Sequence, residues 1–266
     1  MSVQTLYTAA TGMEALETKL DVIANNMANI NTTGFKKDRA NFEDLFYRQQ
    51  RLPGAIDADG NLSSTGVEVG LGTRVSSTQT NHVQGAIQTT DNPLDLAIEG
   101  DGFFEVTTIG GSFYSRAGNF GINANGALVL GSAHRGWLLN PAVNIPQEAT
   151  DVVITSDGQV QFRTSGQDTL QTAGQIQLAT FINPDGLLKV GDNLYQATDA
   201  SGTANLDNPG NPGMGVIAQG ALEASNVEPV QELIDLITTQ RAFELNSQVV
   251  QAGDQIMQIA ANLRRS

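Results

Sequence analysis

Few residues in this chain have the types and spacing that chemistry requires. The 266-residue sequence contains no cysteine, so it offers no disulfide, no thiolate metal ligand and no cysteine nucleophile. Its two histidines, His82 and His134, each lack a second ligand-type residue at the short spacing of a metal site. We therefore expect both to be exposed or locally hydrogen-bonded, with no role in a metal site or a catalytic triad.

Carboxylates supply a second candidate, a calcium-binding loop. Asp57, Asp59, Asn61 and Glu68 occupy positions 1, 3, 5 and 12 of the calcium-loop template. Position 6 of that template must turn sharply and is a glycine, whereas this chain has Leu62 there, and no flanking helices are evident. A solvated Asp-Gly-Asn turn is the better interpretation of this stretch.

Catalytic and nucleotide-binding motifs are also incomplete. Glu99 and Asp101 flank Gly100, and paired carboxylates can hydrolyse glycosides, but a turn explains this pair as well. Gly70-Leu71-Gly72 lacks the third glycine and the following helix of a dinucleotide fingerprint, and the sequence holds no Walker motif. The residues therefore predict a protein with no active site, no cofactor and no metal.

The N-terminal region has the periodicity of an amphipathic helix. Apolar residues recur every three or four positions from Val3, with one irregularity between Met13 and Leu16, and the pattern ends near Gly34, a plausible helix-terminating residue. The stripe that we expect to form an assembly interface contains Leu6, Met13, Leu16, Leu20, Ile23, Met27 and Ile30.

A second amphipathic helix is predicted at the C-terminus. Pro229 suits its first turn, where the missing N–H costs nothing, and Arg241 interrupts the apolar stripe. The interface residues expected on this stripe are Leu233, Ile237, Leu245, Val249, Ile256, Ile259 and Leu263. Because neither helix can leave its stripe in water, we expect the two to pair as a coiled coil and to contact other subunits. The alternative is a two-helix feature packed on the body of a monomer.

The middle of the chain is turn-rich and predicts β-structure. Of the 28 glycines, 25 lie between residues 52 and 227. Hairpin signals occur at Gly110-Gly111, Asn125-Gly126, Asp157-Gly158 and Asp185-Gly186, and residues 198–215 are expected to form a loop. The predicted class is therefore α+β, with paired terminal helices and a β-rich central body that carries an extended hairpin-like arm. We place a helical domain at 1–34 plus 228–266, a linker domain with the arm at 35–80, and an all-β domain at 81–227.

Charge is unevenly distributed along the chain. The formal net charge is −14, and residues 52–227 carry −12 of it, so phosphate repulsion argues against a nucleic-acid partner. No run of 18 apolar residues and no secretory signal pattern is visible. We expect no membrane insertion, and either a cytoplasmic protein or one exported without a cleaved signal peptide.

Residues 23–36, which read IANNMANINTTGFK, resemble the N-terminal motif of bacterial flagellar axial proteins, the rod and hook family. Residues 92–104, 114–120, 222–227 and 240–244 resemble further motifs of this family, so the resemblance covers essentially the whole chain. The motif residues singled out are Asn25, Asn26, Asn29, Gly34 and Phe35. Since asparagine is a poor residue for a helix interior, we hypothesise that side-chain hydrogen bonds of the motif's asparagines fix the register between subunits; these residues are Asn25, Asn26, Asn29 and Asn31.

Residues 42–47, 51–54 and 65–74 look like the insertion found in the distal-rod branch of the family. The resemblance implies that this insertion forms an arm that stiffens the rod, with Leu52, Pro53, Gly54, Gly66, Gly70 and Gly72 as its rigidifying residues. It also implies a structural subunit that polymerises helically into a rigid hollow drive shaft, which transmits torque from the motor to the hook and conducts exported subunits.

The implied partners are further copies of the chain, proximal-rod proteins, the hook protein, the outer-membrane and peptidoglycan ring proteins, and the type III export apparatus. The implied location is the flagellar basal body, spanning the periplasm to the outer membrane. Three alternatives stay open at this stage: a hook or proximal-rod protein, a β-rich secreted hydrolase, and a soluble binding module whose end helices pair within the monomer.

Overall fold

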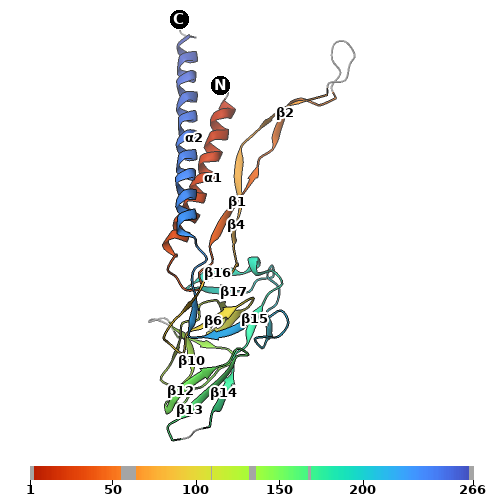
Figure 1. Ribbon diagram of the computed structural model, residues 1–266. Helices are drawn as coiled ribbons and strands as arrows, with labels where there is room; N and C mark the ends of the chain where they lie inside the picture. The colour runs from red at the N-terminus through yellow and green to blue at the C-terminus, as the bar shows by residue number, and fades with distance from the viewer. Residues whose placement is uncertain (1–2, 55–63, 109, 132–135, 167–168, 264–266) are drawn as a thin grey trace. The chain divides into compact units, whose positions relative to one another are not determined.

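The computed structural model describes residues 3–54, 64–108, 110–131, 136–166 and 169–263 (Figure 1). It confirms the α+β class, with a long helix near each end of the chain and β-structure between them. The chain divides into two compact units. Unit 1 contains Met1–Met27, Asp38–Gln79 and Glu228–Ser266, and unit 2 contains Ala28–Lys37 and Thr80–Val227. His134 and the calcium-template residues Asp57, Asp59 and Asn61 lie outside the described residues.

The helices of unit 1 are α1, Val3–Ala28, and α2, Pro229–Leu263. Pro229 begins α2, as its missing N–H predicts. The α1 helix ends two residues before Ile30, because the chain turns at Asn29, whose side-chain and backbone oxygens accept hydrogen bonds from Thr32 at 3.1 and 3.2 Å. Within the described residues, neither helix has a stretch that is both long and apolar enough to cross a membrane.

Two antiparallel ribbons complete unit 1. Strand β1, Asp38–Asp44, pairs with β4, Thr73–Thr80, and β2, Tyr47–Arg51, pairs with β3, Val67–Gly70 (Figure 1). The register of the second ribbon shifts between Gln49 and Arg51, which marks a β-bulge. Every side chain of β2 is exposed.

Unit 2 is rich in β-strands. Its strands are β5 Ile87–Thr89, β6 Leu96–Glu99, β7 Phe103–Thr108, β8 Gly111–Ser115, β9 Phe120–Ile122, β10 Leu128–Gly131, β11 Gly136–Leu139, β12 Ala149–Ile154, β13 Gln159–Thr164, β14 Gln171–Gln175, β15 Leu178–Thr180, β16 Leu188–Gly191, β17 Leu194–Gln196, β18 Asn205–Asp207, β19 Val216–Gln219 and β20 Ala221–Glu223. Among the described residues, the largest sheet has nine strands, with β16-β17-β8-β7-β11-β10-β9 as its main path. Its apolar side chains pack with those of the β12-β13-β14 sheet in a core that contains Phe104, Trp137 and Phe162.

Most of the predicted hairpins are confirmed, and two local predictions are wrong. Turns at Gly110-Gly111, Asn125-Gly126 and Asp157-Gly158 connect the paired strands β7–β8, β9–β10 and β12–β13. Asp185-Gly186 instead lies in the 3-10 turn Pro184–Gly186, because β15 pairs with β7 and β18 and not with β16. The predicted loop 198–215 is interrupted by β18, which this pairing stabilises.

Candidate assembly interface

The two helices contact each other through small and polar residues. Asn26 Nδ2 donates a 3.3 Å hydrogen bond to Glu232 Oε2, and Gly12 lies against the Asn246 side chain. On α2, Glu232, Thr239 and Gly253 are buried and Asn246 is half-buried, so a seven-residue repeat of small and polar side chains runs along one face. We call these four residues the polar heptad.

The predicted apolar stripe of α2 lies on a different part of the helix surface. Its described members, Leu233, Ile237, Leu245, Val249, Ile256 and Ile259, are each 40–61% exposed, whereas the side chain of Leu263 lies outside the described residues. On the α1 side, Ile23 is buried, and Leu6, Met13, Leu16, Leu20, Met27 and the post-helical Ile30 are partly buried. Six large apolar side chains left exposed on one helix are typical of a protein interaction surface.

The asparagines of the N-terminal motif differ in their surroundings. Asn26 is buried, and its amide pairs with the backbone of Asp38 through two 2.9 Å hydrogen bonds in addition to its bond to Glu232. Asn26 therefore connects α1, β1 and α2 within one subunit. Asn25 is exposed on α1, and Asn29 stabilises the turn after it. A role for Asn25 and Asn29 in the register between subunits stays a prediction.

Two of the glycines predicted to belong to the arm lie where an added Cβ would collide with a neighbouring residue. Gly72 has a φ of +121°, and a Cβ there would collide with Thr11 Oγ1 of α1. A Cβ at Gly66 would lie 2.6 Å from the carbonyl oxygen of Arg51 and 2.8 Å from Pro53 Cδ. Gly70 lies opposite Tyr47 in the β2–β3 ribbon. The remaining predicted arm residues, Leu52, Pro53 and Gly54, are exposed, and Gly54 has a φ of +81°.

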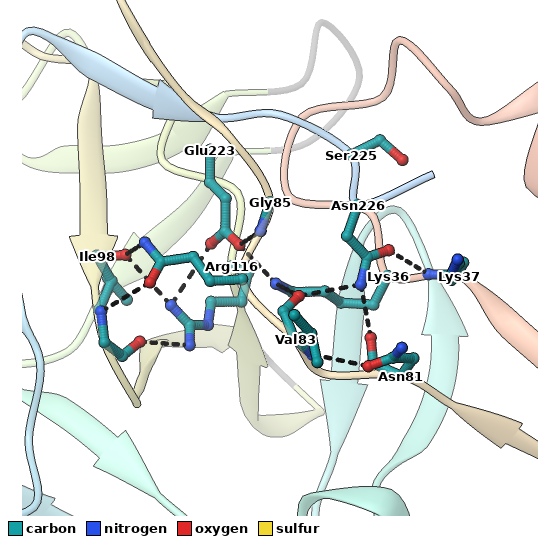
Figure 2. Close-up of polar contacts among 12 residues, drawn as sticks. Lys36, Lys37, Asn81, Val83, Gly85, Ile98, Arg116, Glu223, Ser225 and Asn226 are labelled. Atoms are coloured by element: carbon teal, nitrogen blue, oxygen red, sulfur yellow. Dashed lines mark hydrogen bonds and ion pairs between the residues drawn. The ribbon is translucent and has the colours of Figure 1, made fainter. Parts of the chain in front are cut away.

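Unit 2 contains a buried ionic cluster formed by Lys36, Arg116 and Glu223 (Figure 2). Glu223 Oε1 lies 2.5 Å from Lys36 Nζ, and Oε2 lies 3.5 Å from Arg116 Nη1. All three side chains are at most 4% exposed. Backbone groups complete the cluster: Gly85 N–H donates to Glu223 Oε1 at 2.8 Å, and Arg116 Nη2 donates to the Gly100 carbonyl at 2.7 Å.

Asn226 and Gly34 extend this cluster to both chain segments that connect with the helices. The Lys37 N–H donates to Asn226 Oδ1 at 2.8 Å, and Asn226 Nδ2 donates to the carbonyls of Asn81 and Val83 (Figure 2). The Gly34 N–H donates to the Glu223 carbonyl at 2.8 Å. The segment that follows α1 and the segment that precedes α2 are thus anchored at one place in unit 2.

The electrostatics of the cluster are unbalanced, with two cations for one carboxylate. Burial lowers the pKa of Lys36, and Glu223 opposes that shift. Burial also lowers the pKa of Arg116, again opposed by Glu223. The carboxylate of Glu223 therefore compensates both buried cations, and Asp101 adds a second favourable charge for Arg116. Sequence inspection missed all three residues, although each lies inside or next to a family-like motif.

His82 lies beside this cluster, partly buried among aromatic rings. Its ring centroid is 5.7 Å from those of Phe103 and Tyr195. Burial, together with the positive charges of Lys36, Lys189 and Arg116, lowers its pKa to about 4, with only Asp185 acting in the opposite direction. Among the residues that the structure describes, no group of three or more His, Asp or Glu side chains could hold a metal ion.

We expect the stability of unit 2 to fall between pH 6.5 and 4 because of His82. The ordinary histidine pKa is 6.5 and the folded value is about 4, so the unfolded chain binds more protons in this window. The contribution is fully present above pH 6.5 and is lost as the pH falls to 4, by on the order of 1–3 kcal/mol. Thermal unfolding followed by the fluorescence of Trp137, the sole tryptophan, measures it. His82→Gln should flatten the profile in this window; an unchanged profile would contradict the assignment.

Comparisons with known proteins match nearly the whole chain to flagellar axial proteins. Three family models match: Flagella basal body rod protein at residues 6–36, Flagellar hook protein FlgE/F/G D1 domain at 97–162, and Flagellar basal body rod FlgEFG protein C-terminal at 218–263. The chain is 47% identical to the flagellar basal-body rod protein FlgG of Caulobacter vibrioides, over 98% of this chain and 99% of that protein. It is 44% identical to the flagellar basal-body rod protein FlgG of Agrobacterium fabrum, over 96% of this chain and 97% of that protein. Similarity to the flagellar hook protein FlgE of Treponema pallidum, at 38% identity, covers 57% of this chain and 34% of the hook protein.

Proposed function

The chain belongs to the family of flagellar basal-body rod proteins, and on that premise we propose that it is a structural subunit of the distal rod that polymerises helically into a rigid hollow shaft. The shaft transmits torque from the motor to the hook and leaves a channel for exported subunits. The distal rod is favoured over the hook because the rod relatives match nearly the full chain, whereas the hook relative matches 57% of it.

The exposed apolar face of α2 is the observation that carries this proposal. Large apolar side chains normally turn inward on a helix of a monomeric protein, yet here the polar heptad is buried or half-buried and Leu233, Leu245 and Ile259 are exposed. A face that is not self-complementary around a two-fold axis contacts a different face of its neighbour, and such contacts build open helical assemblies. The α1–α2 coiled coil would then form the inner tube, with its apolar residues packed against adjacent copies.

The arm and the polar heptad have distinct roles in this proposal. The close approach of Gly72 to Thr11 fixes the base of the arm against α1, and the β1–β4 and β2–β3 ribbons extend from there to stiffen the rod. The polar heptad holds α1 and α2 together in one register without using the apolar residues that neighbours need.

We further propose contacts with proximal-rod proteins, the hook protein, and the peptidoglycan and outer-membrane rings, at a site that spans the periplasm. Export through the type III apparatus would carry the chain there without a cleaved signal peptide. No catalytic role is proposed, because the rod relatives are structural proteins and the carboxylates of Glu99 and Asp101 remain explained by the turn before β7.

The double substitution Ile237→Asp and Ile256→Asp should abolish polymerisation. Both side chains are more than 40% exposed on α2, so the charges would leave the subunit fold intact but would be buried unpaired in the assembled tube. Sedimentation and electron microscopy of the purified chain, and swimming of cells that carry the variant, measure the effect.

A matched control is Ile182→Asp, which adds a charge at a side chain that is 95% exposed in unit 2. We expect this variant to polymerise normally. The unfolding of unit 2, reported by Trp137, should be unchanged in both variants. Normal polymerisation of the α2 variant would rule out the proposed helix interface.

A further inference from the structure

The β2–β3 ribbon presents arginines and valines on one face. Arg48 is opposite Val69, and Arg51 is opposite Val67. Residues three apart on a regular strand point to opposite faces, but the bulge between Gln49 and Arg51 restores Arg51 to the face of Arg48. We call Arg48, Arg51, Val67 and Val69 the cationic ribbon face. All four side chains are exposed.

An acidic stripe lies on the solvent-exposed surface of α1. Glu14, Glu17 and Asp21 are spaced three and four residues apart, which places them on one side of the helix, and all three are exposed. Within the described residues, none of these carboxylates takes part in an ion pair, and neither Arg48 nor Arg51 does so. The subunit therefore carries two exposed surfaces of opposite charge that do not neutralise each other.

The two surfaces are also comparable in length. Glu14 and Asp21 are two helical turns apart, or about 10 Å. Arg48 and Arg51 are opposite Val69 and Val67, which are two strand residues or about 7 Å apart, and the long arginine side chains can spread beyond that separation. Two arginines at this separation can each reach one end of the acidic stripe, and Glu17 lies between them. A bidentate guanidinium contact suits a carboxylate, so arginine is well matched to this role.

We propose that the cationic ribbon face of one copy docks on the Glu14–Glu17–Asp21 stripe of another copy of the same chain. This proposal rests on the self-assembly proposed above and names the partner surface of the arm. Val67 and Val69 exclude water beside the arginines, which strengthens the charged contacts that they flank. A neighbour bound at the arm in this way cannot shift along α1 without breaking the contacts of both arginines with the ends of the acidic stripe.

Charge reversal provides the first test. The variant Arg48→Glu with Arg51→Glu, and separately Glu14→Lys with Asp21→Lys, should each raise the critical concentration for polymerisation roughly tenfold or more. A chain that carries all four substitutions should recover most of the wild-type critical concentration, because the charges again match. The control Arg163→Glu reverses an exposed charge in unit 2 and should have no such effect.

Disulfide cross-linking provides the second test, because the native chain has no cysteine. Copies with Arg51→Cys are mixed with copies carrying Glu17→Cys, assembled and oxidised, and the yield of covalent dimer is compared with that from Arg51→Cys and Ile182→Cys. The proposal expects the first mixture to give dimer and the second to give little. The proposed docking is wrong if filaments form but the first mixture yields no more covalent dimer than the control mixture. It is also wrong if the chain with all four substitutions does not recover its critical concentration. In both cases the proposed rod function stands. If the wild-type chain forms no filament, the proposed function itself fails.

Discussion

Replacing Glu223 with glutamine is expected to lower the free energy of unfolding of unit 2 by about 3–5 kcal/mol. The substitution keeps the shape of the side chain but removes the carboxylate that forms ion pairs with both Lys36 and Arg116, two side chains that are nearly inaccessible to water. An amide also brings two N–H donors into a site already filled with donors, because Lys36, Arg116 and the Gly85 N–H all point at this side chain. In a domain of this size, a loss of this magnitude corresponds to roughly 10 °C in melting temperature.

The same cluster provides a sharp control, Lys36→Met, for which we expect a loss below about 2 kcal/mol. This change leaves Arg116 and Glu223 as a balanced pair and removes an ammonium group whose pKa burial already lowers. The Val83 carbonyl loses the Lys36 donor but keeps a 3.0 Å hydrogen bond from Asn226 Nδ2. Thermal and denaturant unfolding followed by Trp137 fluorescence ranks the two variants. If Lys36→Met costs as much as Glu223→Gln, the cluster is held by shape and not by charge balance.

Local patterns in the sequence were sufficient to predict the helices and most of the hairpins. The three- and four-residue spacing of apolar positions identified α1 and α2, because a helix must place such residues on one side. Glycine turns identified the β7–β8, β9–β10 and β12–β13 pairs. Asp185-Gly186 misled the prediction, because the partner of β15 is β7, which is remote in the sequence and leaves no local signal.

The meaning of the apolar stripe was the main difference between pattern and structure. Periodicity shows that one side of α2 is apolar, but it does not show which surface that side contacts. The spacing predicts that the stripe serves both helix pairing and contacts between subunits, whereas the buried positions among the described residues of α2 are Glu232, Thr239 and Gly253. A repeat of polar and small residues is inconspicuous in a search for hydrophobic residues, although its seven-residue spacing is visible in retrospect.

The ionic cluster could not be predicted, because its members are far apart in the chain. Lys36 and Glu223 are separated by 187 positions, and Arg116 and Glu223 by 107. A lysine, an arginine or a glutamate in isolation indicates a solvated surface, and only the fold shows that these three are buried together. The available signal was indirect: each of the three lies in or next to a stretch that resembles a family motif.

Gly34→Ala is expected to lower the free energy of unfolding of unit 2 by roughly 3 kcal/mol. The φ of Gly34 is +68°, a conformation that costs an alanine about 1 kcal/mol. The added Cβ would also lie 2.7 Å from the backbone nitrogen of Ala117 and the carbonyl carbon of Arg116. Backbone atoms cannot rotate away as a flexible side chain can, so relief requires Gly34 to move and to give up its hydrogen bond to the Glu223 carbonyl.

Gly202→Ala separates the two contributions to this loss. Gly202 has a similar φ of +79°, but an added Cβ there would have no neighbouring atom within 4 Å, so only the conformational cost of about 1 kcal/mol applies. The difference between the two variants in Trp137-monitored unfolding measures the clash itself. Equal losses would show that the loop around Gly34 yields easily. A larger loss at Gly34 would mean that the segment after α1 is held rigidly in unit 2.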